Sequence, residues 1–137
     1  MATYSNAMVA NLAELVKHNT VAVEGISAND NPEHIAFKAN LKKQADALGL
    51  DFTDHGYVVI IGLGNSKERV GIITHGDIQP VNPSKWAKSP FELDTTSEPG
   101  KLIARGTEDD KGPISTAMFA MKAIKDQTTA LKKRPEL

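Results

Sequence analysis

The chain has 137 residues, with 16 basic and 17 acidic side chains, a formal net charge of -1 and no cysteine. This length suits one domain of ordinary globular composition. Without cysteine there can be no disulfide, cysteine nucleophile, Cys-ligated zinc finger or iron–sulfur cluster, so a metal site would have to use His, Asp or Glu. The balanced charge argues against a nucleic-acid-binding protein, because such proteins contact phosphates through clustered Lys and Arg.

The N-terminal segment carries no recognisable targeting signal. Residues 1–23 have neither the charged start and apolar core of a signal peptide nor a run near the roughly 20 apolar residues that span a bilayer. We therefore expect a cytoplasmic protein with no membrane partner.

Two amphipathic helices are predicted before residue 50. In the first, apolar residues recur at helical spacing, at Met8, Leu12, Leu15 and Val16. The second begins after Asn31, a favourable N-cap followed by a proline, and ends at Gly49. Its apolar stripe consists of Phe37, Leu41, Ala45 and Leu48.

The next part of the chain has the patterns of β-strands. Residues 51–55 alternate weakly, and after a turn at Gly56 residues 57–63 form an apolar, β-branched run. Residues 70–74 are apolar on both faces, which is typical of a strand covered on both sides of its sheet. Two further short strands, 91–95 and 101–104, are predicted as a hairpin.

A third helix follows the loop 105–112. Its stripe is Ile114, Ala117, Met118, Met121 and Ile124, and Pro113 suits the first turn. The order helix, helix, several strands, helix predicts an α/β domain, a layered mixed sheet with flanking helices.

Polar residues directly after the apolar run 70–74 are the first candidates for a site, because loops at strand ends carry most α/β active sites. Side chains two apart in an extended chain point the same way, so His75 and Asp77 can project together. An imidazole suits zinc, and a nearby carboxylate can accept its other N–H. The alternative is a loop that is merely polar. The other three histidines are expected to be ordinary surface or half-buried side chains.

A second cluster precedes the third helix. Glu108, Asp109 and Asp110 could cap this helix and complement its dipole. They could instead supply a carboxylate that bridges two cations, because each of its oxygens can bind a different ion. Together the two clusters form a candidate site with one histidine and several carboxylates.

These residues follow a known pattern. Its blocks are Thr74-His75-Gly76-Asp77-Ile78-Gln79-Pro80, Trp86, Ser89-Pro90-Phe91, and Lys101 to Pro113 with the central run Arg105-Gly106-Thr107-Glu108-Asp109-Asp110-Lys111-Gly112. In order and spacing they resemble the co-catalytic di-zinc metallopeptidase family. That family includes carnosinase-type dipeptidases, glutamate carboxypeptidases, aminoacylases and succinyl-diaminopimelate desuccinylase, and the chain is most similar to the carnosinase type.

The resemblance implies roles for individual residues. His75 would bind one metal ion and Asp109 would bridge two, while Asp77 would be the catalytic-site acid that orients His75. Asp110 would follow the bridging ligand across a cis peptide bond, and Arg105 and Lys111 would have supporting, positioning roles. The metals would be two divalent ions, zinc first, with manganese or cobalt as alternatives.

Three positions depart from the family pattern: Gly76 is usually a bulkier residue, and Ile103-Ala104 stands where Tyr-Gly is usual. The family's Glu-Glu pair, with the general base and a metal ligand, and its remaining ligands have no counterpart in residues 1–137. We therefore expect the chain to be an incomplete N-terminal portion of a phosphorylase/hydrolase-like catalytic domain. The remainder of that domain and the dimerisation and lid domain would be absent.

The resemblance implies metal-dependent hydrolysis of a peptide or amide bond in a small substrate, most simply by a dipeptidase or carboxypeptidase. Residues 1–137 alone would be inactive without the general base. The alternatives are an N-acyl amino acid deacylase or desuccinylase, and a truncated, non-catalytic interaction module. The full-length parent is expected to be a homodimer, and this portion could self-associate through an exposed strand edge.

Overall fold

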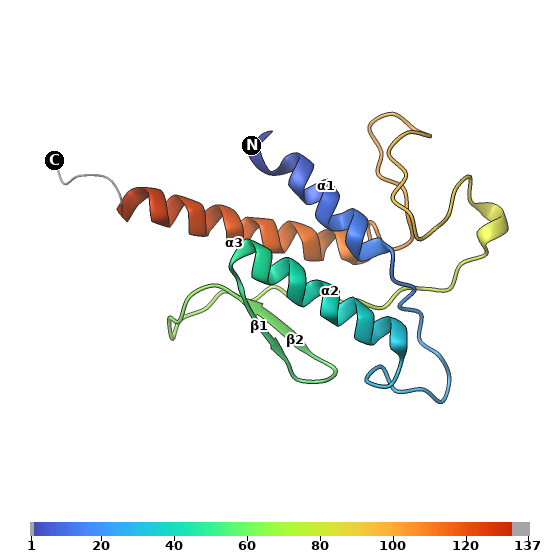
Figure 1. The fold of residues 1–137 in the computed structure, drawn as a ribbon, viewed down its shortest axis with the longest axis horizontal. Coiled ribbons are helices and arrows are strands. Elements are labelled where there is room, and N and C mark those ends of the chain that lie inside the picture. Colours follow the sequence, from blue (N-terminus) through green and yellow to red (C-terminus); the bar gives the residue numbers. More distant parts are fainter. Residues whose placement is uncertain (1, 133–137) are drawn as a thin grey trace.

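A computed structural model describes residues 2–132 of the chain. Its helices are α1 (Ala2–Val16), α2 (Pro32–Leu48) and α3 (Lys111–Lys132), its strands are β1 (Asp51–Asp54) and β2 (Val59–Gly62), and a short 3-10 helix η1 covers Pro83–Lys85. The predicted α/β class is confirmed (Figure 1). Within residues 2–132, no helix combines the length and the apolar character that crossing a membrane requires.

Helix α2 has the boundaries that the sequence predicts. The Asn31 side chain accepts a hydrogen bond from the backbone N–H of Glu33 at 3.0 Å, which satisfies one of the free donors of the first turn. At the other end Gly49 has φ 66°, the left-handed conformation that glycine adopts without a steric penalty. Both signals act within a few residues of the helix end, so they can be read from the sequence.

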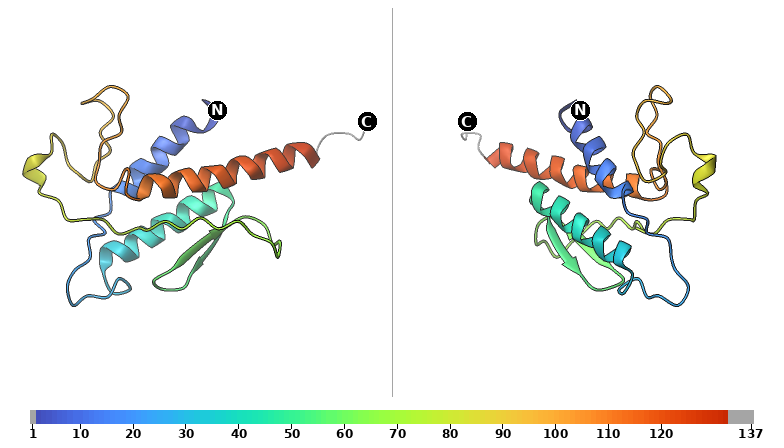
Figure 2. Two further views of the ribbon diagram at one scale, coloured as in Figure 1. Left: turned by 180° about the vertical axis from the view of Figure 1, so that it is seen from behind. Right: turned by 45° about the vertical axis from the view of Figure 1, so that its right-hand side comes forward.

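The three helices pack around one core. Helix α1 lies against both α3 and α2, and the β1–β2 hairpin packs against α2 (Figures 1 and 2). The buried residues of the main cluster come from all three helices and from the residue after Gly49: Leu15, Phe37, Leu41, Ala45, Leu50, Ile114 and Met118. The predicted apolar stripes therefore meet, except that Ile124 is 60% exposed. The end of α3 runs past α1 and α2 (Figures 1 and 2).

The β1–β2 hairpin is antiparallel and pairs Asp51 with Gly62 and Asp54 with Val59. Its turn contains Gly56 at φ 85°. Lys38 of α2 holds this turn, because its Nζ lies 2.9 Å from Oδ2 of Asp54 and donates to the carbonyl of Gly56 at 3.2 Å. The strands are shorter than the predicted runs 51–55 and 57–63.

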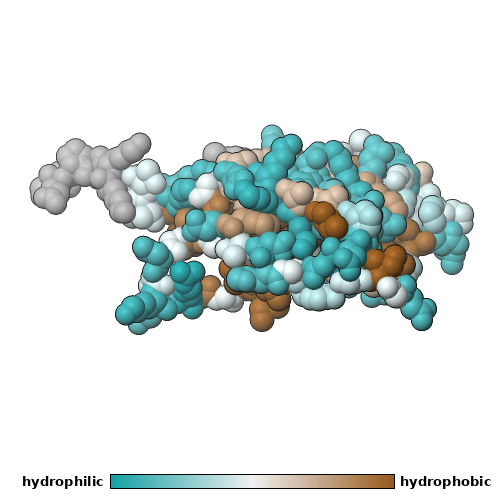
Figure 3. Space-filling model, turned by 60° about the horizontal axis from the view of Figure 1, so that its bottom comes forward, coloured by the Kyte–Doolittle hydropathy of each residue, from teal (hydrophilic) through white to brown (hydrophobic). Residues whose placement is uncertain are grey.

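The predicted strand at residues 70–74 is wrong for the described part of the chain, where this segment has no strand pairing. Val70 and Ile73 are 97% and 98% exposed, and Ile72 is 66% exposed. A strand that is apolar on both faces needs neighbouring strands and a layer on each side. The two-stranded sheet of residues 2–132 supplies neither for it. Figure 3 shows hydrophobic side chains at the surface, among hydrophilic ones.

The second predicted hairpin is reduced to one antiparallel bridge between Asp94 and Ile103. Their backbone groups exchange two hydrogen bonds of 2.9 Å. Side-chain contacts of Asp94 hold the turn that follows: its Oδ1 accepts from the backbone N–H of Thr96 and Ser97 and from Nζ of Lys88. The chain therefore reverses direction where the sequence predicts, but without two extended strands.

Candidate metal centre

The two polar clusters of the sequence lie together in the structure. The segment that follows residue 74 carries His75, and the loop that precedes α3 carries Asp109 and Asp110. Nε2 of His75 lies 2.8 Å from Oδ1 of Asp109. The backbone N–H of His75 donates to Oδ2 of Asp110 at 3.2 Å. Residues that are 34 and 35 positions apart in the chain thus form one group.

Asp77 lies on the other side of the imidazole ring. Nδ1 of His75 is 3.1 Å from the backbone oxygen of Asp77 and 3.2 Å from its carboxylate Oδ1. A hydrogen bond from Nδ1 to Asp77 fixes the ring orientation and leaves Nε2 facing Asp109. This is the geometry that an orienting acid requires.

The group is open to solvent. The side chains of His75, Asp77 and Asp109 are 48%, 56% and 74% exposed. Desolvation lowers the pKa of His75, but the hydrogen bond with Asp109 and the contacts with Asp77 outweigh it and raise this pKa above its ordinary value. Because these side chains are exposed, ions and small molecules can reach the imidazole and the carboxylates directly.

The donor set suits a divalent metal ion. His75, Asp109 and Asp110 each offer one ligand atom, and the three atoms lie within 4.8 Å of one another. Imidazole and carboxylate are both ligands of zinc, manganese and cobalt. The positive end of the α3 dipole also favours carboxylates at this place.

The charges of these acids suit the α3 dipole, but the Asp110 side chain is directed to another partner than the first turn of the helix. The Asp110 side chain accepts from His75, and the contribution of Asp110 to the start of α3 is its backbone oxygen, which accepts from the N–H of Ile114 at 3.1 Å. The peptide bond between Asp109 and Asp110 is cis, as the resemblance implies.

Lys111, which directly follows Asp110, is fully buried. Its Nζ donates to the backbone oxygen of His18 at 2.7 Å and lies 5.0 Å from the ring centroid of Phe37. Burial lowers the pKa of Lys111 to about 8. Its ammonium group therefore lies at the contact between the end of α1, α2 and the start of α3.

Arg105 contacts the loop around residues 86–90. Its backbone N–H donates to the oxygen of Pro90 at 2.7 Å, and its guanidinium carbon lies 5.7 Å from the ring centroid of Trp86. These contacts tie the loop before α3 to the loop around residues 86–90. The geometry is consistent with a supporting role rather than a metal ligand.

The departure at Gly76 has a structural reason. A Cβ atom on this residue would lie 2.4 Å from Cε1 of Phe37, so the ring occupies the place of a side chain. Thr20 holds the same residue from the other direction, because its hydroxyl donates to the Gly76 oxygen. The sequence pattern puts Phe37 on the apolar stripe of α2 but connects neither Phe37 nor Thr20 with the site, because no local pattern links α2 or residue 20 to residue 76.

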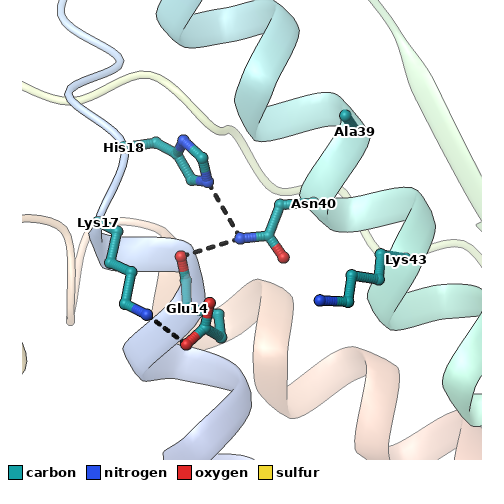
Figure 4. A pocket seen from close by; sticks show the side chains of 6 residues that line it. All are labelled: Glu14, Lys17, His18, Ala39, Asn40 and Lys43. Carbon is teal, nitrogen blue, oxygen red and sulfur yellow. Dashed lines mark hydrogen bonds and ion pairs between the residues drawn. The ribbon is translucent and has the colours of Figure 1, made fainter.

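An open pocket of about 360 Å³, lined mainly by residues with polar side chains, lies elsewhere, between the end of α1 and α2 (Figure 4). Asn40 spans it and donates to the Glu14 backbone oxygen at 3.0 Å, and its amide also contacts Nε2 of His18 at 3.0 Å. Burial lowers the pKa of His18, which favours a neutral ring. His18 is thus the half-buried histidine that the sequence predicts.

Comparison with known proteins identifies the sequence pattern. Residues 71–135 match the family model of Peptidase family M20/M25/M40. This range contains all of the candidate site residues, from His75 to Lys111. The chain resembles part of an M20-type peptidase. The resemblance that the motifs indicated is therefore confirmed.

Two bacterial relatives illustrate the match. A Bacillus subtilis (strain 168) protein named "Putative dipeptidase YtjP" is 34% identical over 79 residues, which are 58% of this chain and 16% of that protein. A Staphylococcus aureus (strain USA300) protein, also named a putative dipeptidase, is 38% identical over 86 residues, or 61% of this chain and 18% of its own length. The match thus spans less than a fifth of the length of these relatives.

The crystal structure of human carnosine dipeptidase 1 has a similar fold. It superposes with a TM-score of 0.67 over 90% of this chain and 30% of that chain, at 23% sequence identity. The fold of this chain is therefore similar to that of about a third of this solved structure.

Proposed function

We propose that this chain is the N-terminal, metal-binding portion of a peptidase that hydrolyses a peptide bond in a small substrate, most simply a dipeptide. The observation that carries the proposal is the 2.8 Å contact between Nε2 of His75 and Oδ1 of Asp109, with Asp110 in the same group. The names of the relatives favour a dipeptidase over a carboxypeptidase or an N-acyl amino acid deacylase.

In this proposal His75 and Asp109 hold the metal, with Asp109 bridging two divalent ions, zinc in the first instance. Such ions supply Lewis-acid polarisation of the scissile carbonyl and lower the pKa of water. Asp77 orients the His75 ring through Nδ1, so that Nε2 stays directed at the ligand group. Arg105 and Lys111 support the loop that carries Asp109.

The proposal places the general base and the remaining ligands outside residues 1–137, in further parts of the catalytic domain and a dimerisation and lid domain. The small matched share of the relatives and of the solved structure supports this view. We therefore expect residues 1–137 to hydrolyse no dipeptide when zinc or manganese is added. Measurable dipeptide hydrolysis by the purified chain would contradict the expectation. We also expect the protein to be cytoplasmic and its full-length parent to be a homodimer.

Zinc titration followed by NMR of the four histidine rings tests the metal site. We expect the ring signals of His75 to shift first, and we expect Asp109→Asn to weaken this response strongly. His55→Ala is the matched control, because residue 55 lies in the β1–β2 turn, and it should leave the His75 response unchanged. A zinc response that is spread equally over all four histidines, or that Asp109→Asn does not alter, would refute the site.

A further inference from the structure

One aromatic ring lies close to both parts of the metal-ligand group, the segment that carries His75 and the loop that carries Asp109. Phe37 of α2 is 5% exposed and belongs to the main core cluster. One edge of its ring occupies the position where residue 76 would carry a side chain, directly beside His75. The ring also lies 5.0 Å from Nζ of Lys111, two residues after Asp109.

Lys111 is held from two sides. Its ammonium group donates to the carbonyl of His18, two residues beyond the end of α1, where a cation also complements the helix dipole. The ring of His18 in turn packs edge-on against Phe37, with ring centroids 5.9 Å apart. Phe37, His18 and Lys111 thus form a closed set of contacts that links α1, α2 and the start of α3.

Packed interiors transmit such constraints, because a buried ring has few alternative positions. The segment that carries His75 lies so close to Phe37 at Gly76 that a Cβ atom there would clash with the ring. The loop that carries Asp109 is anchored through the stem and ammonium group of Lys111. The position of the ring therefore determines how far apart the two segments can lie.

We propose that Phe37 is a positioning residue that keeps His75 and Asp109 within contact distance, acting through Gly76 on one side and Lys111 on the other. The inference rests on the proposed function only for its metal-binding consequence. The juxtaposition itself rests on contacts among the chain's own residues.

The test compares Phe37→Leu and Lys111→Met with the wild-type chain. F37L keeps an apolar side chain but removes the ring edge, and K111M keeps the stem but removes the ammonium group. The first measurement, without metal, is the nuclear Overhauser contact between the His75 ring and the Asp109 side chain. The second is the zinc affinity from the His75 ring signals. Circular dichroism establishes that each variant retains the helical content.

Lys125→Met is the matched control. Lys125 is on the same helix, and its Nζ also donates to a backbone carbonyl, that of Gly49 at the end of α2, away from the ligand group. We expect F37L and K111M to lose the His75–Asp109 contact and to bind zinc about 10–100-fold more weakly, the usual effect of removing a group that positions a metal ligand. K125M should keep both the contact and the affinity.

The outcomes separate the two proposals. If folded F37L and K111M retain the contact and the wild-type zinc affinity, the positioning role is wrong, whatever the function. The same holds if K125M weakens zinc binding as much as K111M does. If the wild-type chain shows the contact and both variants lose it, but zinc does not bind at His75, the proposed metal site fails and the positioning role stands. K111M keeps the test decisive should F37L not fold.

Discussion

A Cβ atom on Gly76 would lie 2.4 Å from Cε1 of Phe37, closer than real Cβ contacts come. The backbone beside the candidate ligand His75 is therefore packed directly against the core of the three helices. This contact explains why glycine stands where the family pattern has a bulkier residue, and it connects the stability of the core with the geometry of the site.

The first prediction concerns this contact. Gly76→Ala should lower the free energy of unfolding by about 1–3 kcal/mol, because the added methyl group overpacks against a buried ring. Gly71→Ala is the control, since a Cβ there meets no atom within 4 Å. Urea unfolding of both variants measures the difference. Equal stability of G76A and G71A would show that Phe37 moves aside freely.

The N-cap of α2 provides the second prediction. Asn31→Ala removes the acceptor for the Glu33 N–H and should cost about 0.5–2 kcal/mol of unfolding free energy. Asn31→Gly, which leaves the N–H open to water, should cost only a few tenths of a kcal/mol. Thermal unfolding of the two variants tests the order. An alanine variant as stable as the glycine variant would argue against the cap.

The third prediction follows from the turn around Asp94. Hydrogen bonds from Lys88, Ser97 and Thr96 hold the pKa of this carboxyl far below its usual range. The folded state therefore binds fewer protons there than the unfolded state. The stabilisation is complete above the unfolded pKa of about 3.9 and is lost progressively as the pH falls below it towards the folded pKa.

We therefore expect Asp94→Asn to be less stable than wild type at neutral pH and to approach wild-type stability in acid. Urea unfolding at several pH values measures the difference. Asp30→Asn, at an exposed turn residue, is the control and should show a much smaller change with pH. A difference for D94N that stays constant down to the acid transition would contradict the electrostatic explanation.

The exposed apolar segment gives the fourth prediction. Val70 and Ile73 lie almost fully in solvent, on a backbone without strand partners in the described residues. Such a segment favours association with a second copy. Ile73→Lys should shift sedimentation velocity profiles towards the monomer at high concentration. Val23→Lys, at a residue 48% exposed in another loop, should not. A wild-type chain that is monomeric at all concentrations would refute the association.

The sequence by itself determined the features that act over short distances. Asn31 and Gly49 set the ends of α2 because capping involves only neighbouring backbone groups. The spacing of apolar residues predicted all three helices, and the two polar clusters around His75 and Asp109 pointed to one site through their resemblance to the metallopeptidases. The α/β class followed from the order of the elements.

Only the tertiary structure decided what depends on contacts between distant segments. The pattern of residues 70–74 describes a buried strand, yet burial requires neighbours that residues 2–132 do not place around it. Conversely, nothing near residue 76 in the sequence indicates that Phe37 fills its side-chain space or that the ammonium group of Lys111 binds the carbonyl of His18. Periodicity and caps are local properties, whereas packing partners are selected by the whole fold.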